Sequence, residues 1–125
     1  MAYNTIEPDV RRIIRKTRGT SGLREALAEF HYEQGERLER EAAHCEGSEQ
    51  KGRLEEALVE YEISFREYPH LKTAQKLVSG YVKLGTIKKD HGMPGVEEDF
   101  AKSEFYQEQI QHQRTHRCPE RNHLR

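Results

Sequence analysis

The chain has 125 residues, of which 34% are hydrophobic and 34% are charged, and its formal net charge at pH 7 is -1. This length suits one domain with a single modest core, and the polar composition favours thin helical layers over a thick two-sided sheet. Because no apolar run approaches the roughly 20 residues of a membrane-spanning helix and the first residues lack the order of a secretion signal, we expect a soluble cytoplasmic protein.

The first predicted helix covers about residues 7–17. Pro8 suits its first turn, Asp9 favours the positive end of the helix, and Arg15 favours the negative end. The run 18–22 contains two glycines and interrupts it, so a second helix begins at Thr20 or Ser21 and reaches about Ala43. Apolar side chains recur along this second helix at helical spacings: Leu23, Ala26, Leu27, Phe30, Leu38 and Ala42.

The third predicted helix has the clearest apolar stripe. The polar stretch 46–52 has a glycine near each end and is predicted to be an exposed turn before this helix. The stripe then alternates spacings of four and three and consists of Leu54, Leu58, Tyr61, Phe65 and Tyr68. Pro69 cannot continue a helix and disfavours helical backbone at the residue before it, so the segment is predicted to end there.

A fourth helix is predicted to follow almost at once and to end at Gly85, with a loop over 86–95. Its inward face consists of Ala74, Leu77, Val78, Tyr81 and Leu84. A fifth helix covers about 96–113, with Phe100, Ala101 and Phe105 packing inward and Tyr106 and Ile110 as further candidates for the same face. No strand pattern occurs, so we predict an all-α fold of about five helices: a basic cap or arm at 1–20, a helical domain at 21–113 and a polar, flexible tail at 114–125.

The charges are segregated along the chain. Residues 1–24 carry six basic and two acidic side chains, 25–67 carry five and thirteen, and 68–93 carry five and one. Residues 94–111 then carry one basic and five acidic side chains, and 112–125 carry four and one. Such blocks favour antiparallel neighbours of opposite sign, within one chain or between copies, although exposed pairs contribute only about 0 to 1 kcal/mol each.

The third and fourth predicted helices resemble the tetratricopeptide repeat family, in which each unit is a pair of antiparallel helices. In that family a glycine opens the second helix, a small residue lies where the helices approach, an aromatic residue follows, then another small residue, and proline ends the unit. Gly52, Ala57, Tyr61, Ser64 and Pro69 match this order and spacing. The best match covers Gly52 to Gly85, Gly35 and Leu38 fit the preceding helix, and Ala101 and Phe105 repeat the spacing of Ala57 and Tyr61.

The resemblance implies a non-catalytic interaction module or adaptor, because family members bind peptides or partner helices in a groove lined by the first helix of each unit. Here those helices are the second and fourth, one acidic and one basic. On the fourth, the groove residues implied are Lys72, Gln75, Lys76, Ser79, Val82 and Lys83. On the second they are Glu29, Tyr32, Glu36 and Arg40. Two units are few for such a stack, so an N-terminal cap or a second copy is expected to complete it.

Two other functions stay open. The basic residues Arg11, Arg12, Arg15, Lys16 and Arg18 recur near helical spacing and would contact nucleic acid or pair with the acidic second helix. The alternating charge blocks would also suit a self-assembling structural subunit. No serine or cysteine nucleophile turn and no phosphate loop occurs, so we predict no enzyme activity and no cofactor.

The C-terminal region contains His112, His116, Cys118 and His123. A structural zinc site needs four ligands in a defined frame, and Pro119 separates Cys118 from His123, so we predict no metal site. Cys45 and Cys118 are too few for a disulfide framework and are expected to be free thiols.

Overall fold

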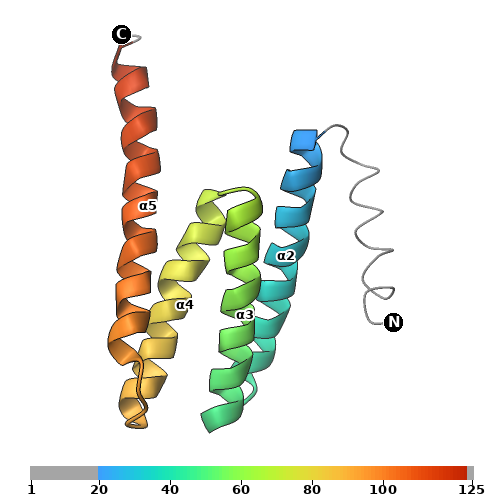
Figure 1. The fold of residues 1–125 in the computed structure, drawn as a ribbon, viewed down its shortest axis with the longest axis vertical. Coiled ribbons are helices and arrows are strands. Elements are labelled where there is room, and N and C mark those ends of the chain that lie inside the picture. Colours follow the sequence, from blue (N-terminus) through green and yellow to red (C-terminus); the bar gives the residue numbers. More distant parts are fainter. Residues whose placement is uncertain (1–19, 124–125) are drawn as a thin grey trace. The chain divides into compact units, whose positions relative to one another are not determined.

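The computed structural model describes the backbone of residues 20–123 and the side chains of residues 22–113 (Figure 1). That range contains four α-helices: α2 (Thr20–Ala43), α3 (Gly47–Glu67), α4 (Leu71–Asp90) and α5 (Val96–His123). No strand occurs in the same range, which confirms the all-α prediction for it. The helix predicted over 7–17 lies outside the described residues. None of the helices in the described range combines the length and apolar character that crossing a bilayer requires.

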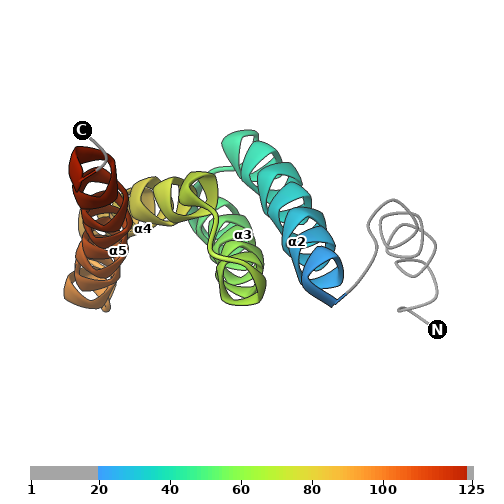
Figure 2. The same cartoon turned by 90° about the horizontal axis from the view of Figure 1, so that it is seen from above.

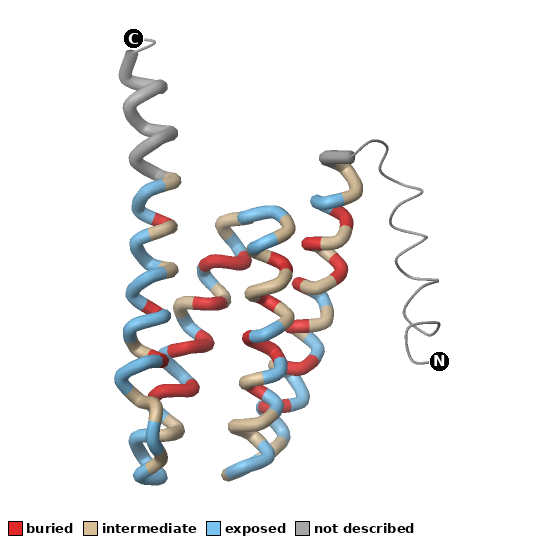
Figure 3. Tube along the Cα trace, viewed as in Figure 1, coloured by how far each residue is buried: buried red, intermediate tan, exposed pale blue. Residues whose placement is uncertain are grey.

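The chain divides into two compact units, residues 1–70 and residues 71–125. Helices α2 and α3 form an antiparallel hairpin in the first unit, and α4 and α5 form another in the second (Figures 1 and 2). Buried residues occur along the length of α2, α3 and α4, whereas most of the described part of α5 is exposed or half-buried (Figure 3). Each hairpin therefore buries an apolar stripe of one helix against its neighbour, as amphipathic helices do.

The first hairpin has a shorter connection than predicted. Helix α2 has the predicted bounds, but α3 begins at Gly47 rather than at Gly52. The predicted turn over 46–52 is wrong, because residues 47–52 are the first turns of α3 and only residues 44–46 connect the helices. Gly47 adopts a φ of 64°, which a glycine tolerates without strain, so the chain reverses there and the polar residues that follow become an exposed helical face.

The second hairpin also departs from the prediction. Helix α4 continues through Gly85 to Asp90, so the predicted loop over 86–95 is reduced to residues 91–95. The positive-φ glycines of that loop are Gly92 (63°) and Gly95 (94°). The prediction that the last helix ends at Gln113 is wrong as well, because the backbone of α5 is helical to His123. Proline at position 119 removes one backbone donor and its ring crowds the preceding turn, at a cost of about 3 kcal/mol, but the backbone stays helical through it.

The centre of the first hairpin lies at Ala57 and Tyr61 of α3, which are 0% and 1% exposed. Leu54 and Leu58 are also buried, while Phe65 is half-buried and Tyr68 is exposed. The prediction that Ala57 and Tyr61 face inward is therefore confirmed. The far end of the predicted stripe is less buried than its spacing suggested.

In the second hairpin, the predicted inward face of α4 is confirmed, since Ala74, Leu77, Tyr81 and Leu84 are buried. The predicted inward face of α5 is partly wrong. Ile110 is buried as predicted and Phe100 and Tyr106 are half-buried, but Ala101 is exposed and Phe105 is 52% exposed. The other buried residues of the described part of α5 are Asp99 and Ser103. The inward face of α5 is thus more polar than a search for apolar spacing would select.

The α2–α3 hairpin is organised around a glycine that faces an aromatic ring. A Cβ atom placed on Gly35 would lie 2.6 Å from Cε1 of Tyr61, so only glycine fits that position without a shift of the ring. Three residues beyond Tyr61, the buried Oγ of Ser64 donates a hydrogen bond of 2.6 Å to the backbone carbonyl of Ala28, seven residues before Gly35. These four residues fix how closely the helices approach and in which register.

The α4–α5 hairpin contains the same arrangement. A Cβ atom on Gly85 would lie 2.7 Å from Cε1 of Phe100. Three residues beyond Phe100, the Oγ of Ser103 donates a hydrogen bond of 2.9 Å to the carbonyl of Val78, seven residues before Gly85. We call each such set of four residues a glycine-aromatic frame. The two hairpins therefore share this packing arrangement, with Phe100 and Ser103 in the places of Tyr61 and Ser64.

This equivalence corrects the repeat predicted from sequence. Ala101 and Phe105 were expected to match Ala57 and Tyr61, but both are exposed and neither belongs to the second frame. Phe100, and not Phe105, corresponds to Tyr61 because it faces a glycine on the neighbouring helix. An aromatic ring can approach a helix backbone this closely only where the side chain is absent.

Candidate partner-binding surfaces

The predicted groove residues of α4 share one side of the helix. At about 100° per residue, Lys72, Gln75, Lys76, Ser79, Val82 and Lys83 fall on a single continuous side, away from the buried face formed by Leu77, Tyr81 and Leu84. Five of the six are exposed and Lys76 is half-buried. We call these six residues the α4 ridge.

The α4 ridge combines positive charge with one apolar side chain. Val82 is 44% exposed, which is high for a valine, and it lies between the lysines at 76 and 83. The Oγ of Ser79 donates a hydrogen bond of 3.3 Å to the carbonyl of Lys76. A surface of this kind offers a ligand charge complementarity together with a small apolar contact.

The predicted groove residues of α2 are less accessible. Glu29 and Glu36 are half-buried, whereas Tyr32 is only 8% exposed and its ring packs on that of Tyr61 at a centroid distance of 5.6 Å. Tyr32 therefore contributes to the packing of the α2–α3 hairpin and offers a partner little surface, contrary to its predicted groove position. Arg40 is exposed.

Carboxylates of α2 surround the two tyrosines. The Tyr61 hydroxyl donates a hydrogen bond of 2.6 Å to Oε1 of Glu39. Burial raises the pKa of the Tyr61 phenol, and the hydrogen bond to Glu39 raises it further. Burial likewise raises the pKa of Tyr32, and the negative charge of Glu36 adds to the effect. Both phenols are thereby kept protonated, and Glu39 is held by a charge-assisted hydrogen bond that fixes its direction.

Sequence reasoning did not select Glu39, nor the ion pair between Lys88 and Asp99 in the second hairpin. Nζ of Lys88 lies 2.8 Å from Oδ2 of Asp99, and the two side chains are 12% and 7% exposed. The angles of this contact fall short of a hydrogen bond, so it is a close ion pair. Opposite charges on either side of the glycine loop were visible in the sequence, but their burial was not.

The described residues do not test several predicted sites. The basic residues Arg11, Arg12, Arg15, Lys16 and Arg18 lie outside the described range, as do the side chains of His116, Cys118 and His123. Among the residues whose side chains are described, no group of three or more metal-ligating side chains lies together. The groove predicted between α2 and α4 involves both units and stays a prediction.

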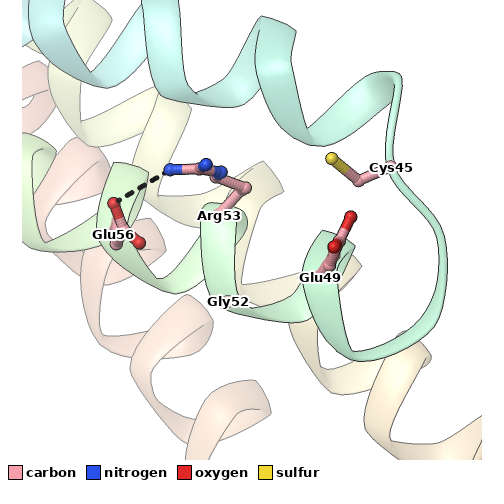
Figure 4. A pocket seen from close by; sticks show the side chains of 5 residues that line it. All are labelled: Cys45, Glu49, Gly52, Arg53 and Glu56. Atoms are coloured by element: carbon pink, nitrogen blue, oxygen red, sulfur yellow. Dashed lines mark ion pairs between the residues drawn. The ribbon is translucent and has the colours of Figure 1, made fainter.

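One pocket of about 320 Å³ lies at the start of α3 (Figure 4). Cys45, from the connection between α2 and α3, lines it together with Glu49, Gly52, Arg53 and Glu56 of α3. Cys45 is a free thiol, and Nη1 of Arg53 lies 3.8 Å from Oε2 of Glu56. No histidine is among the lining residues, so the pocket offers the thiol no imidazole base of the kind that activates cysteine nucleophiles.

Comparison of the chain with family models, with curated proteins and with solved structures finds no match to any of them. The resemblance to tetratricopeptide repeats therefore stays a prediction carried by the residues named for it. The two glycine-aromatic frames are properties of the hairpins themselves and do not depend on that resemblance.

Proposed function

We propose that the protein is a non-catalytic interaction module that binds a partner peptide or helix through the α4 ridge. The observation that carries this proposal is the segregation of α4 into a buried face and an exposed ridge that holds three lysines, with Val82 at its edge. A partner that presents acidic side chains beside an apolar one would match this ridge in both charge and shape.

The second hairpin supports the proposal because it holds the ridge in place before a partner arrives. Helix α4 is fixed on α5 by the frame at Gly85 and Phe100 and by the buried ion pair of Lys88 with Asp99. A surface that is ordered in advance loses less conformational entropy when it binds, which favours affinity.

The acidic side of α2 provides a second contact of opposite sign. Glu29 and Glu36 remain partly accessible, and the carboxylate of Glu39 is oriented by Tyr61. A partner with a basic segment would bind this side of α2 through charge, separately from the α4 ridge.

The test compares two variants that change the charge equally. In the first, Lys72, Lys76 and Lys83 are replaced by glutamate; in the control, Lys51, Arg66 and Lys89, which lie off the α4 ridge, are replaced by glutamate. Each purified protein is used to capture partners from extracts of the native host, and captured proteins are quantified by mass spectrometry. The proposal expects the first variant to lose specific partners that the wild type and the control retain.

Far-ultraviolet circular dichroism establishes that each variant keeps its helices. Equal capture by the wild type and the ridge variant would refute the proposal. Equal loss in the ridge variant and the control would refute it as well, because the effect would then come from net charge rather than from the α4 ridge.

A further inference from the structure

The outer side of α5 carries an exposed aromatic ring among acidic side chains. Phe105 is 52% exposed and lies on the side of α5 away from α4, whereas Ser103, Tyr106 and Ile110 lie on the inner side. The exposed residues that share the outer side are Glu97, Glu98, Ala101, Glu104 and Glu108. We call these five residues and Phe105 the α5 acidic face.

The Phe105 ring lies beside the ring of its neighbour Tyr106. It lies edge-on to Tyr106 at a centroid distance of 5.1 Å and an interplanar angle of 80°. Tyr106 in turn stacks on Tyr81 of α4, with centroids 6.2 Å apart and an interplanar angle of 5°. Exposed aromatic side chains are common anchors of protein interfaces, because they offer a large contact area with only two rotatable bonds.

The α5 acidic face has little positive charge near it. Within residues 96–113 the only basic residue apart from histidine is Lys102, and its Nζ lies 5.3 Å from the centroid of the Tyr81 ring. The ammonium group is thus directed toward α4. The four glutamates around Phe105 therefore present a negative surface that would attract a basic ligand with an apolar centre.

The α4 ridge, in the same unit, is a basic surface with an exposed apolar side chain. The α4 ridge has three lysines with an exposed valine at its edge, and the α5 acidic face has four glutamates and an exposed phenylalanine. One surface lies on the side of α4 away from α5, and the other on the side of α5 away from α4. They are complementary in charge, each has one large exposed apolar side chain, and they cannot meet within one hairpin.

We propose that the α5 acidic face of one copy binds the α4 ridge of a second copy of this chain. Phe105 of one copy would lie beside Val82 of the other, with the glutamates opposite Lys72, Lys76 and Lys83. This inference rests on the proposed function and names a second copy as a partner of the α4 ridge. Because the two surfaces differ, the contact is head-to-tail and the copies form a row. One end of the row presents an α4 ridge and the other end presents an α5 acidic face, so further copies can add at either end.

A head-to-tail row of helical hairpins also matches the packing arrangement that the two hairpins share. Repeat proteins stack successive units so that each contacts only its neighbours, and two units bury little surface by themselves. Association between copies would lengthen the stack. Since its attractive forces are largely between exposed charges, the row should shorten as salt is added.

The test is a charge-swap experiment on the full-length chain. One variant carries Lys72→Glu, Lys76→Glu and Lys83→Glu, so both surfaces are acidic; the other carries Glu98→Lys, Glu104→Lys and Glu108→Lys, so both are basic. Light scattering after size-exclusion chromatography and sedimentation velocity are measured at low salt over a range of concentrations. We expect the wild type to form oligomers, each variant alone to be monomeric, and an equimolar mixture to form oligomers again.

Phe105→Ala tests the apolar contact separately. The side chain is exposed, so the helical circular-dichroism signal should be retained while association weakens at least tenfold. A wild-type chain that stays monomeric at all concentrations overturns the inference, as do charge variants that assemble like the wild type or a mixture that stays monomeric. The proposed function survives a monomeric wild type if the lysine variant still loses its captured partners, so the two failures are distinguishable.

Discussion

The ring of Tyr61 lies against the backbone at Gly35, where even one added carbon atom would come within 2.6 Å of a ring carbon. The ring cannot easily move aside, because it is 1% exposed and its hydroxyl is hydrogen-bonded to Glu39. Gly85 and Phe100 repeat this relationship in the second hairpin. The packing of both hairpins thus depends on glycines in the middle of helices, where glycine is otherwise unfavourable.

Gly35→Ala is expected to destabilise the protein by about 1 to 3 kcal/mol, because the added methyl group overpacks the contact with Tyr61. Gly52→Ala is the matched control. Gly52 also lies within a helix, but nothing lies within 4 Å of its Cβ position, so alanine should raise stability by about 0.5 to 1 kcal/mol. Urea unfolding followed by circular dichroism measures both changes, and a Gly35→Ala protein as stable as Gly52→Ala would contradict the close contact.

The buried phenol of Tyr61 predicts a loss of stability at high pH. Its pKa is raised in the folded state, so the folded protein keeps the phenolic proton at pH values where the unfolded chain releases it. This contribution is fully present below about pH 10, the ordinary tyrosine value, and is lost as pH rises above it. The free energy of unfolding should fall by up to about 1.4 kcal/mol per pH unit for this group.

Tyr61→Phe should make that decline shallower, while removing the hydrogen bond to Glu39 should lower stability at neutral pH by about 1 kcal/mol. Tyr68→Phe removes a hydroxyl from an exposed ring and is the control. Urea titrations at several pH values from neutral to strongly alkaline, with tyrosinate absorbance recorded in parallel, provide the measurement. Identical pH slopes in the wild type and Tyr61→Phe would show that the phenol is not the group responsible.

Removal of Lys88 is expected to be costly because Asp99 would be left as an unpaired buried charge. Lys88→Met should lower the free energy of unfolding by about 3 to 5 kcal/mol. The double variant Lys88→Met/Asp99→Leu removes both charges and should recover most of this loss, since apolar replacements of buried ion pairs are often neutral. The recovery keeps the prediction testable even if the single variant does not fold.

Arg37→Met is the exposed counterpart of this experiment. Arg37 pairs with Glu41 at 3.9 Å, and both side chains are well exposed, so its loss should change stability by about 0 to 1 kcal/mol. Thermal unfolding of the four proteins ranks the effects. A double variant no more stable than Lys88→Met would mean that burial of an unpaired carboxylate is not the source of the loss.

Two buried hydroxyl groups should respond in opposite directions. Thr73 is fully buried and its Oγ1 has no hydrogen-bond acceptor or donor among the described residues, so Thr73→Val should stabilise the protein by about 1 kcal/mol. Ser64 is equally buried but donates to the carbonyl of Ala28, so Ser64→Ala should destabilise it by about 0.5 to 1.5 kcal/mol. Chemical denaturation at neutral pH tests both, and a loss of stability in Thr73→Val would point to an interaction of that hydroxyl.

Much of the local structure was predictable from residue spacing. The start of α2, the end of α3 before Pro69 and the start of α5 at Val96 follow from caps, proline and apolar periodicity, which act within a few residues. The exposed side of α4 was also predictable, because one helix face holds the lysines and the other holds Leu77, Tyr81 and Leu84. These features depend on residues that are close to one another in the sequence.

The errors occurred where a distant residue decides the outcome. Gly85 has the position of a helix stop, but Phe100 packs on it, and the helix continues to Asp90. Ala101 and Phe105 have the spacing of an inward pair, but Ser103 and Asp99 are the residues that are buried. The carbonyl of Val78 accepts a hydrogen bond from the Ser103 hydroxyl, and Lys88 forms an ion pair with the Asp99 carboxylate. A search for apolar periodicity cannot identify polar residues that are buried because they form a hydrogen bond or ion pair with another helix.

By itself the sequence determined that the described chain is helical, which side chains form its apolar stripes and where its charges alternate, since backbone propensity and amphipathic spacing are properties of short segments. Only the tertiary structure decided that Gly35 faces Tyr61 as Gly85 faces Phe100, and that Phe105 lies outside among glutamates. The reason is that the fit between two helices depends on the shape of both surfaces at once, and even one added carbon atom at such a contact disturbs the packing.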